Sequence, residues 1–302
     1  MKKPLLLKIL QSKELYLFCV PGIIITLIFH YWPLYGAQIA FRAYTARRGI
    51  WGSPWVGWEH FIRFFNSPNA ALIIWNTLVL SIYSLAAGFP MPIILALLLN
   101  SFRHKHYTKV IQTVTYAPNF ISTVVMCGMI ILYLSPRVGM VNKLIGFFGA
   151  GPVNFMGEQA MWRHIYVWTG IWQGMGWSSV VYFAALSGVS PELHEAAMVD
   201  GATKFQRIIH IDLPTIIPVA VMLLILSFGS MFSIGFEKVY ALQNPLNLGV
   251  SEIISTYVYK IGILNADQSY SSAIGLFNSA VNAILLITVN TVSRKLSDNA
   301  LW

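Results

Sequence analysis

Charged side chains are scarce in this sequence. Asp, Glu, Lys and Arg make up 10% of its 302 residues, whereas hydrophobic residues make up 56%. A soluble domain carries roughly 25% charged residues, so this chain has too few charges to cover a surface that faces water. The composition therefore predicts an integral membrane protein. The net charge of +9 comes from scattered basic residues, which is typical of membrane-flanking anchors and unlike the basic stripe of a nucleic-acid-binding protein.

Cysteines are also rare, and one common nucleotide-binding motif is missing. The sequence has two cysteines, Cys19 and Cys127, and both fall within apolar runs. Two such residues do not make a metal cluster alone, so we interpret them as small buried hydrophobic side chains. Neither GxxxxGKS nor GxxxxGKT occurs, which excludes an ATPase built on a P-loop.

Long uncharged runs are abundant instead. A transmembrane helix needs about 20 mostly apolar residues, and several runs without Asp, Glu, Lys or Arg exceed that length. They are Leu15–Phe41, Asn69–Phe102, Val110–Leu134, His164–Pro191, Leu213–Phe236 and Gln268–Ser293. The sequence thus predicts an all-α integral membrane protein with six transmembrane helices. The first run is too long for the core of a signal peptide, and we interpret it as an uncleaved helix.

The basic residues between the runs predict an orientation. If the N-terminus is cytoplasmic, Lys and Arg are denser in the short inside segments than in the long outside segments. Because positive charge concentrates on the cytoplasmic side, we expect both termini to lie in the cytosol. Trp51, Trp55 and Trp58 in the first outside segment indicate anchoring at the membrane interface or, alternatively, a docking surface for an extracytoplasmic partner.

The runs lack the groups that drive or catalyse reactions in membranes. Ion-coupled transporters usually keep ionisable groups in mid-membrane, and membrane enzymes need carboxylates, histidines or a nucleophile with its base. Here only His30 and His164 lie in the runs, near their ends. A solute moved uphill must therefore take its energy from a partner. A membrane enzyme or scaffold is the alternative, for which His104 and His106 come closest to a reactive pair, although a solvated basic loop explains them.

Uncharged polar and aromatic side chains are plentiful in the runs. Aromatic rings stack on sugar faces and amides hydrogen-bond hydroxyls, so this set suits an uncharged, polyhydroxylated ligand. The candidate pathway residues are Trp172, Gln173, Trp177, Tyr182, Asn278 and Asn282. Helix packing explains any single one of them as well, since Gly170 and Gly174 form a GxxxG pattern that lets helices approach closely.

The segment Ser190–Pro214, SPELHEAAMVDGATKFQRIIHIDLP, interrupts the apolar runs with a compact polar stretch. Its opening Ser-Pro-Glu favours a helix start, and Asp200–Gly201 predicts a sharp turn at its end. A second short helix is expected from about Ala202 to Ile211. Two short helices continuous with two membrane spans can transmit a push from a cytosolic partner.

The spacing within this segment is specific. Glu195-Ala196-Ala197-x-x-Asp200-Gly201-Ala202, followed by Ile211-x-Leu213-Pro214, resembles the EAA loop of permease subunits in binding-protein-dependent ABC importers. In that family the loop docks into a groove of the ATPase subunit. The resemblance implies that the coupling residues are Glu195, Ala196, Ala197, Asp200, Gly201, Ala202, Phe205 and Ile208. Ile208 stands where the family commonly has an aromatic residue, and Phe205 one turn earlier keeps an apolar anchor.

Further motifs extend the resemblance over nearly the whole chain. Asn76-Thr77-Leu78 and Leu95–Ser101 look like carbohydrate-uptake permeases. Phe236–Leu246, Thr256–Ile263, Ser269–Phe277 and the terminal Leu-Trp are similar to a subgroup associated with oligo- and polysaccharide-derived substrates. The resemblance implies a type I ABC importer transmembrane fold. Its divisions would be an N-terminal part at 1–68, a five-helix core at 69–293 with the coupling loop at 190–214, and a cytoplasmic tail at 294–302.

The implied function is that of a permease subunit in a bacterial cell membrane, which forms half of the translocation pathway for a carbohydrate, namely an oligosaccharide. The implied partners are a second, non-identical permease, two ABC ATPases, an extracytoplasmic solute-binding protein and membrane lipid, with no nucleic acid. ATP and Mg would act on the ATPases, so this chain would hold no cofactor, metal or catalytic residue. Glu237 is assigned to the outer gate or to a structural salt bridge. A non-sugar solute is the alternative, and the sequence does not give the identity of the sugar.

Overall fold

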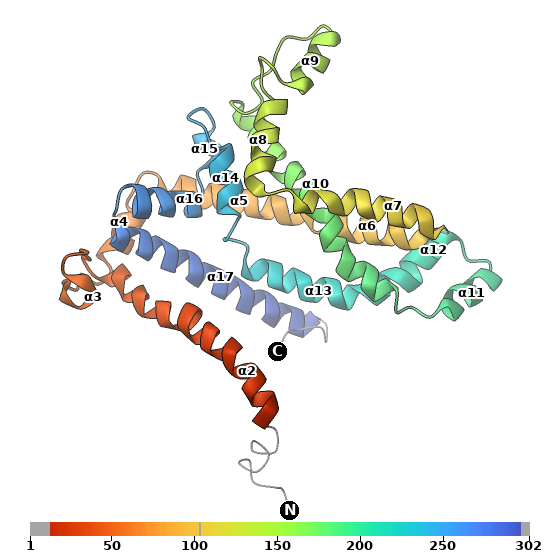
Figure 1. The fold of residues 1–302 in the computed structure, drawn as a ribbon, viewed down its shortest axis with the longest axis horizontal. Helices are drawn as coiled ribbons and strands as arrows, with labels where there is room; N and C mark the ends of the chain where they lie inside the picture. Colours follow the sequence, from red (N-terminus) through yellow and green to blue (C-terminus); the bar gives the residue numbers. More distant parts are fainter. Residues whose placement is uncertain (1–12, 103, 297–302) are drawn as a thin grey trace, which may run out of the picture. The chain divides into compact units, whose positions relative to one another are not determined.

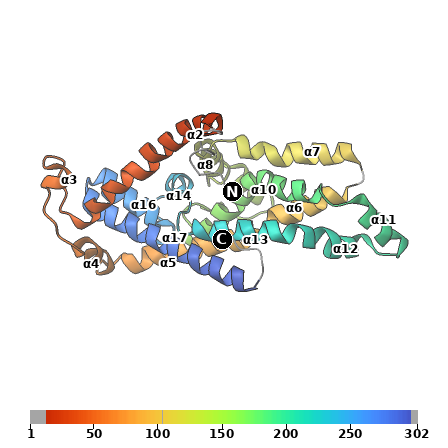
Figure 2. The same ribbon diagram turned by 90° about the horizontal axis from the view of Figure 1, so that it is seen from below.

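The computed structural model describes residues 13–102 and 104–296. The beginning of the predicted N-terminal part, at 1–12, and most of the predicted tail, at 297–302 with the terminal Leu-Trp motif, lie outside this part of the chain. The described residues form helices and loops, with an isolated antiparallel bridge between Arg42 and Trp55. They divide into two units, the first made of residues up to Asn66 with Val258–Leu276 and the second of Ser67–Tyr257 with the segment from Phe277 (Figures 1 and 2).

The first unit contains an N-terminal helical stretch, two short helices and the start of the last long helix. Its elements are α2 (Lys13–Thr26), a π-helical turn (Leu27–Tyr31), a 3-10 helix (Trp32–Phe41), α3 (Gly49–Gly52), α4 (Glu59–Phe65), a π-helical turn (Lys260–Leu264) and the beginning of α17 (Gln268–Leu296). Helix α16 (Ile254–Tyr259) joins the two units in sequence.

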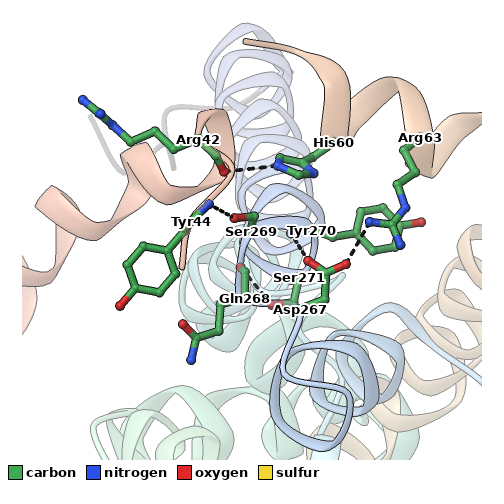
Figure 3. Close-up of polar contacts among 9 residues, drawn as sticks. All are labelled: Arg42, Tyr44, His60, Arg63, Asp267, Gln268, Ser269, Tyr270 and Ser271. Carbon is green, nitrogen blue, oxygen red and sulfur yellow. Dashed lines mark hydrogen bonds and ion pairs between the residues drawn. The ribbon is translucent and has the colours of Figure 1, made fainter. Parts of the chain in front are cut away.

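Polar contacts hold the loop after residue 41 against the start of α17 within this unit (Figure 3). Nη1 of Arg63 lies 2.8 Å from Oδ2 of Asp267, and its guanidinium lies 4.1 Å from the centre of the Tyr270 ring. The backbone N–H of Tyr44 donates to Oγ of Ser269 at 2.8 Å. These contacts join residues more than 200 positions apart in the sequence, and no local pattern predicts them.

The second unit carries the remaining helices. They are α5 (Ala70–Gly88), α6 (Pro90–Ser101), α7 (Lys105–Tyr116), a 3-10 turn (Ala117–Phe120), α8 (Thr123–Tyr133), α9 (Met140–Phe147), α10 (Gln159–Leu186), α11 (Pro191–Val199), α12 (Lys204–Arg207), a π-helical turn (Ile208–Asp212), α13 (Leu213–Gly229), α14 (Phe236–Leu242) and α15 (Leu248–Ser251). Helix α10 is central, because it packs against α5, α6, α7 and α13.

Two apolar cores form along α10. The first lies among α5, α8, α10 and α14 and includes the fully buried Trp162, whose Nε1 donates to the Leu242 carbonyl at 3.2 Å. The second lies among α6, α10 and α13, where Tyr182 packs with Ala96 and Ile216. Burying such large side chains is the main stabilising contribution in each core.

Helices α7 and α10 approach most closely at Gly176, where a Cβ would collide with the Thr115 carbonyl oxygen. The two glycines of the GxxxG pattern differ. A Cβ added at Gly170 would stand 3.0 Å from Nζ of Lys238 on α14, whereas one added at Gly174 meets nothing within 4 Å among the described atoms.

Buried polar side chains fix the loop after α14 to α5. Nδ2 of Asn76 donates to the carbonyls of Gly249 and Glu252 at 3.0 and 3.2 Å, and its Oδ1 accepts from Arg163 at 2.7 Å. Oγ1 of the neighbouring Thr77 accepts from the N–H of Ile254 at 3.0 Å. The Asn-Thr-Leu motif thus places two residues in the second turn of α5 that satisfy loop backbone groups, which are costly to bury unpaired.

Among residues 13–102 and 104–296, four helical stretches are long and apolar enough to cross a membrane, or five if one bent pair is a single span. The four are Leu17–Phe41, Ala70–Ser101, Lys204–Gly229 and Gln268–Lys295. The fourth predicted run corresponds to α10, which is not one of these four stretches. It is long enough, but its tryptophan, glycine, serine and glutamine residues lower its hydropathy. Large apolar side chains such as Phe18, Phe29 and Phe147 are exposed, as expected for a protein solvated by lipid.

The third predicted run is not one straight helix. Its two parts, His106–Phe120 and Thr123–Tyr133, meet at an angle of 97°. Pro118 precedes the break, and the Ser122 hydroxyl caps α8 by accepting from the N–H of Val125.

The expectation for the cysteines is half correct, because Cys127 is buried whereas Cys19 is exposed.

Candidate functional site

The segment Ser190–Pro214 forms two short helices at one end of the second unit, in the bend between α10 and α13 (Figures 1 and 2). Helix α11 begins as the sequence predicts, because the Ser190 hydroxyl accepts from the N–H of Glu192 at 3.3 Å and Pro191 occupies the first turn. Both features satisfy or remove backbone donors that have no partner at a helix start.

The Asp200–Gly201 turn ends α11 in the predicted manner. Gly201 has φ +79, a left-handed conformation that glycine adopts without steric cost. The N–H of Ala202 then donates to the carbonyl of Ala197 at 2.8 Å, and the N–H of Gly201 donates to that of Met198 at 3.1 Å. This is the hydrogen-bonding pattern of a Schellman motif, and it gives the Ala197 to Ala202 spacing a local structural reason.

The second helix differs from the prediction at both ends. It begins at Lys204 instead of Ala202, because Thr203 caps it in a reciprocal box with Gln206. The N–H of Thr203 donates to Oε1 of Gln206 at 2.7 Å, and the N–H of Gln206 donates to the Thr203 hydroxyl. It does not stop at the predicted Ile211, since the π-helical turn Ile208–Asp212 continues it directly into α13. The second short helix is thus the start of the long helical stretch Lys204–Gly229.

A buried carboxylate connects this segment to the rest of the unit. Asp212 is 3% exposed, and its Oδ1 lies 3.4 Å from Nε2 of His194 on α11 and accepts from Nδ2 of Asn100 at the end of α6 at 3.2 Å. Three helices therefore meet at one oxygen atom. No motif in the sequence predicted this contact among three residues, although Asp212 is the one acidic residue directly before the fifth run.

The outer surface of the two helices is unusually apolar for a loop. Leu193, Met198, Val199 and Phe205 are 56%, 51%, 87% and 70% exposed. Among the predicted coupling residues, Glu195, Ala196, Asp200, Gly201 and Phe205 are exposed, whereas Ala197, Ala202 and Ile208 are half-buried. An exposed apolar patch with polar residues around it is typical of a surface that binds another protein.

The candidate pathway residues fall into two groups. Trp172 and Trp177 on α10 are 46% and 54% exposed, and Asn278 has a buried Oδ1 with no hydrogen-bond partner among the described atoms. These three keep groups available to a ligand. Glu237 is exposed in the first turn of α14, and no salt bridge to it occurs in the described part of the chain.

The other candidates have structural partners. Gln173 donates to the carbonyl of Ile121 at 2.9 Å, where the break before α8 leaves that group free. Tyr182 is buried in the second core. Asn282 accepts from the N–H of Phe232 at 2.9 Å and donates to Ser233 at 3.0 Å, which stabilises the chain after α13. Helix and loop packing accounts for these three side chains.

An aromatic stripe on α10 was missed. Nε1 of Trp168 donates to the Tyr83 hydroxyl at 3.0 Å, and that hydroxyl lies 2.7 Å from Nδ1 of His164. His164, Trp168 and Trp172 follow one another at four-residue intervals and are all exposed. Residues four apart share one face of a helix, so this spacing was the signal in the sequence.

Lys238 is the least expected polar group of the unit. It lies on α14 and is 8% exposed, and its Nζ donates to the carbonyl of Tyr166 at 2.9 Å. Burial lowers the pKa of Lys238 to about 8.

No group of three or more His, Cys, Asp or Glu side chains in residues 13–102 and 104–296 is arranged to hold a metal ion.

Residues 88–298, which include the coupling segment and α10, match the family described as binding-protein-dependent transport system inner membrane component. The chain belongs to this family of transport permeases. The match covers more than half of the chain and contains the polar segment, α13 and all of α17. The family resemblance and the ABC transporter permease assignment drawn from the coupling motif are thereby confirmed.

The similarity to individual permeases extends over the full length. The chain is 43% identical over 301 residues to the polygalacturonan/rhamnogalacturonan transport system permease protein YteP of Bacillus subtilis (strain 168), covering 100% of this chain and 94% of that protein. It is 38% identical to a chain of a bacterial ABC transporter involved in import of the acidic polysaccharide alginate, with a TM-score of 0.90, covering 97% of this chain and 99% of that one. A second structure of a bacterial alginate transporter, in complex with alginate pentasaccharide-bound periplasmic protein, gives a TM-score of 0.89 at 38% identity and covers 97% and 98%. These two structural matches confirm the type I ABC permease fold.

Proposed function

We propose that this chain is a permease subunit of an ATP-driven importer for an oligosaccharide, and that it forms half of the translocation pathway. The observation that carries the proposal is the likeness over 97% of the chain, at TM-score 0.90, to a permease chain of an alginate importer. The full-length similarity to a permease for polygalacturonan and rhamnogalacturonan supports the same substrate class. No feature of the described residues favours an enzyme or a scaffold over transport.

The mechanism assigns the mechanical step to α11 and α12. Two separate ATPases close on ATP and push the apolar outer surface formed by Leu193, Met198, Val199 and Phe205. The push reaches α13 by two routes, along the continuous helix from Lys204 and through the contact between His194 and Asp212. Nucleotide and the loaded binding protein then stabilise different states of the pathway, which is alternating access.

The proposed assembly contains a second, homologous but non-identical permease, two ABC ATPases that hold ATP and Mg, and an extracytoplasmic solute-binding protein. The complex with a saccharide-loaded periplasmic protein in a structural relative supports the last of these. The proposed location is the bacterial cell membrane. This chain itself is proposed to carry no catalytic residue or cofactor.

The proposed topology keeps six spans. The first, second, fifth and sixth are the four apolar helical stretches, the third is the bent pair ending at Tyr133, and the fourth is α10. Both termini and the coupling helices then lie in the cytosol, which agrees with the denser positive charge of those segments. The division into 1–68, 69–293 and 294–302 remains a proposal, as do the eight coupling residues.

For the sugar pathway, the structure favours an aromatic surface on α10. Trp172 and Trp177 offer exposed rings on different faces of the helix, and Trp168 with Tyr83 extends the face of Trp172 toward the helix start. Asn278 adds an amide oxygen without a partner. We propose these side chains as sugar contacts, whereas Gln173, Tyr182 and Asn282 position the backbone around them. Glu237 is proposed as a residue of the outer gate.

Co-purification tests the coupling surface. The chain is expressed with the second permease and the ATPase, as wild type and as the double variant Glu195→Lys, Gly201→Asp. We expect the ATPase to co-purify with the wild type and to be lost from the variant, while the second permease stays bound to both. A matched control, Lys143→Gln, changes an exposed charge on α9 and should retain the ATPase. If the double variant also retains it, α11 and α12 are not the coupling helices.

Uptake tests the substrate class. The complete transporter with its binding protein is placed in vesicles loaded with ATP, and uptake of oligosaccharides, peptides and polyamines is compared. Uptake of an oligosaccharide, with matching stimulation of ATP hydrolysis, is the expected result. Stimulation by a peptide or polyamine instead would overturn the carbohydrate assignment while leaving the permease assignment intact.

A further inference from the structure

Lys238 occupies a position that is costly for a lysine. Its ammonium group is held against α10, where Nζ donates to the Tyr166 carbonyl at 2.9 Å and lies 4.9 Å from the centre of the Tyr166 ring. A Cβ added at Gly170, one turn further along α10, would stand 3.0 Å from Nζ. Glycine at this position therefore leaves room for the ammonium group.

No acidic side chain neutralises this ammonium group in the described part of the chain, and Tyr166 O is the one hydrogen-bond acceptor of its three N–H groups there. A buried charge without a counter-charge is strongly disfavoured. A backbone carbonyl and an aromatic face offset only part of that cost. The site is therefore incomplete without an anion.

A cavity of about 270 Å³ adjoins the ammonium group. Its lining residues include Ser84, Gly88, Gly170, Gly174, Ser178 and Lys238. The Ser84 hydroxyl is buried and has no hydrogen-bond partner among the described atoms, which is a second polar group in need of a ligand. Three glycines keep the cavity open. Its size is just below the about 300–1,000 Å³ of drug-sized ligand sites, so it suits one sugar unit at a time.

The charge of the cavity selects the ligand chemistry. A cation and hydroxyl groups bind a carboxylate and neighbouring sugar hydroxyls well, because hydrogen bonds between charged partners are the strong ones. We infer that Lys238 binds the carboxylate of an acidic sugar, so that the transported oligosaccharide contains uronate units. This inference rests on the proposed function. The sequence predicted an uncharged ligand because Lys238 lies after the fifth run and therefore outside the apolar runs. In the folded chain, α14 places Lys238 against α10.

The test compares acidic and neutral saccharides on the assembled transporter. Binding of oligogalacturonides and alginate oligosaccharides, and of their carboxyl-reduced forms, is measured on the purified permease–ATPase complex by tryptophan fluorescence. The variants are Lys238→Gln, which retains a donor for the Tyr166 carbonyl, Lys238→Arg, which retains the charge, and Lys143→Gln, a surface control. Uptake of the same saccharides with the binding protein is measured in parallel.

We expect the wild type to bind an acidic oligosaccharide at least about tenfold more tightly than its reduced form, the size expected for one charged hydrogen bond. Lys238→Gln should remove this preference, and Lys238→Arg and Lys143→Gln should keep it. Equal weakening of acidic and reduced forms in Lys238→Gln, or a preference that persists without the charge, would overturn the inference alone. If the wild type takes up neither form, the proposed function fails and the inference fails with it.

Discussion

Nε2 of His194 lies 3.4 Å from Oδ1 of Asp212, and this contact joins α11 to the turn that leads into α13. Because Asn100 donates to the same oxygen at 3.2 Å, the end of α6 belongs to the junction as well. The carboxylate is almost fully buried, so loss of either contact would leave a buried polar group unpaired. We therefore expect a movement of α11 to reach α6 and α13 through these side chains, in addition to the chain connection.

The junction predicts a coupling defect when Asp212 is replaced by alanine. His194 and Asn100 then lose a buried partner, which typically costs about 1–3 kcal/mol. We expect ATP hydrolysis by the assembled transporter to continue while the sugar transported per ATP falls. Asp212→Asn keeps an acceptor oxygen and should restore much of the ratio. Glu192→Gln, an exposed change on α11, is the control, and an unchanged ratio in Asp212→Ala would show that the junction transmits nothing.

The turn between the coupling helices predicts a difference between two substitutions of Gly201. With φ +79 and no described atom within 4 Å of an added Cβ, alanine is opposed by backbone strain alone, at about 1–2 kcal/mol. Asparagine tolerates this conformation better. Gly201→Ala should therefore weaken co-purification of the ATPase more than Gly201→Asn does. Equal retention by both variants would contradict a structural requirement for the left-handed turn.

Two glycines of α10 predict different effects of substitution by alanine on stability. A Cβ at Gly176 collides with the Thr115 carbonyl oxygen, whereas one at Gly174 meets open space. Gly176→Ala must push α7 away from α10, and overpacking of this kind typically costs about 1–3 kcal/mol. We expect a lower melting temperature in detergent for Gly176→Ala and an unchanged one for Gly174→Ala. The reverse order would mean that α7 and α10 do not meet at Gly176.

The pKa of Lys238 predicts a pH dependence for acidic substrates. Because burial lowers this pKa to about 8, the ammonium form is present below that pH and is lost above it. The titratable groups that face it are Tyr166 on α10 and Cys127 on α8, whose Sγ lies 3.9 Å from the Lys238 carbonyl. Binding of an acidic oligosaccharide to the purified complex should weaken as the pH rises from 7 to 9.

Lys238→Arg provides the matched control for this pH profile. Arginine stays protonated over the whole range, so the variant should bind acidic oligosaccharide equally well at pH 7 and pH 9. Carboxyl-reduced saccharide should show no such pH dependence in either protein. A parallel decline in wild type and variant would assign the pH effect to a group other than Lys238.

Local features of the fold followed from the sequence. The cap at Ser190 and the turn at Gly201 depend on residues within a few positions of each other, so the pattern alone predicted them. The limits of the second helix were wrong, because the Thr203–Gln206 box was overlooked. The break at Phe120 was also missed, although Pro118 marks it.

The candidate site was predictable in part for the same reason. The proposed coupling residues are adjacent in the sequence, and a single motif predicts them. Of the proposed pathway residues, Trp172 and Trp177 remain exposed, whereas Gln173 and Asn282 proved to satisfy backbone groups of distant segments. A sequence does not distinguish an amide that binds a ligand from one that closes a backbone gap, because both occur in an apolar run.

By itself, the sequence indicated that this protein lies in a membrane. It also gave the approximate positions of the apolar helices and the location of the proposed coupling loop. Composition and short-range spacing set these features, and both are properties of the chain before it folds. Only the tertiary structure decided which polar groups meet. Asp212 receives His194 and Asn100, and Lys238 reaches Tyr166, because helix packing brings together residues far apart in the sequence.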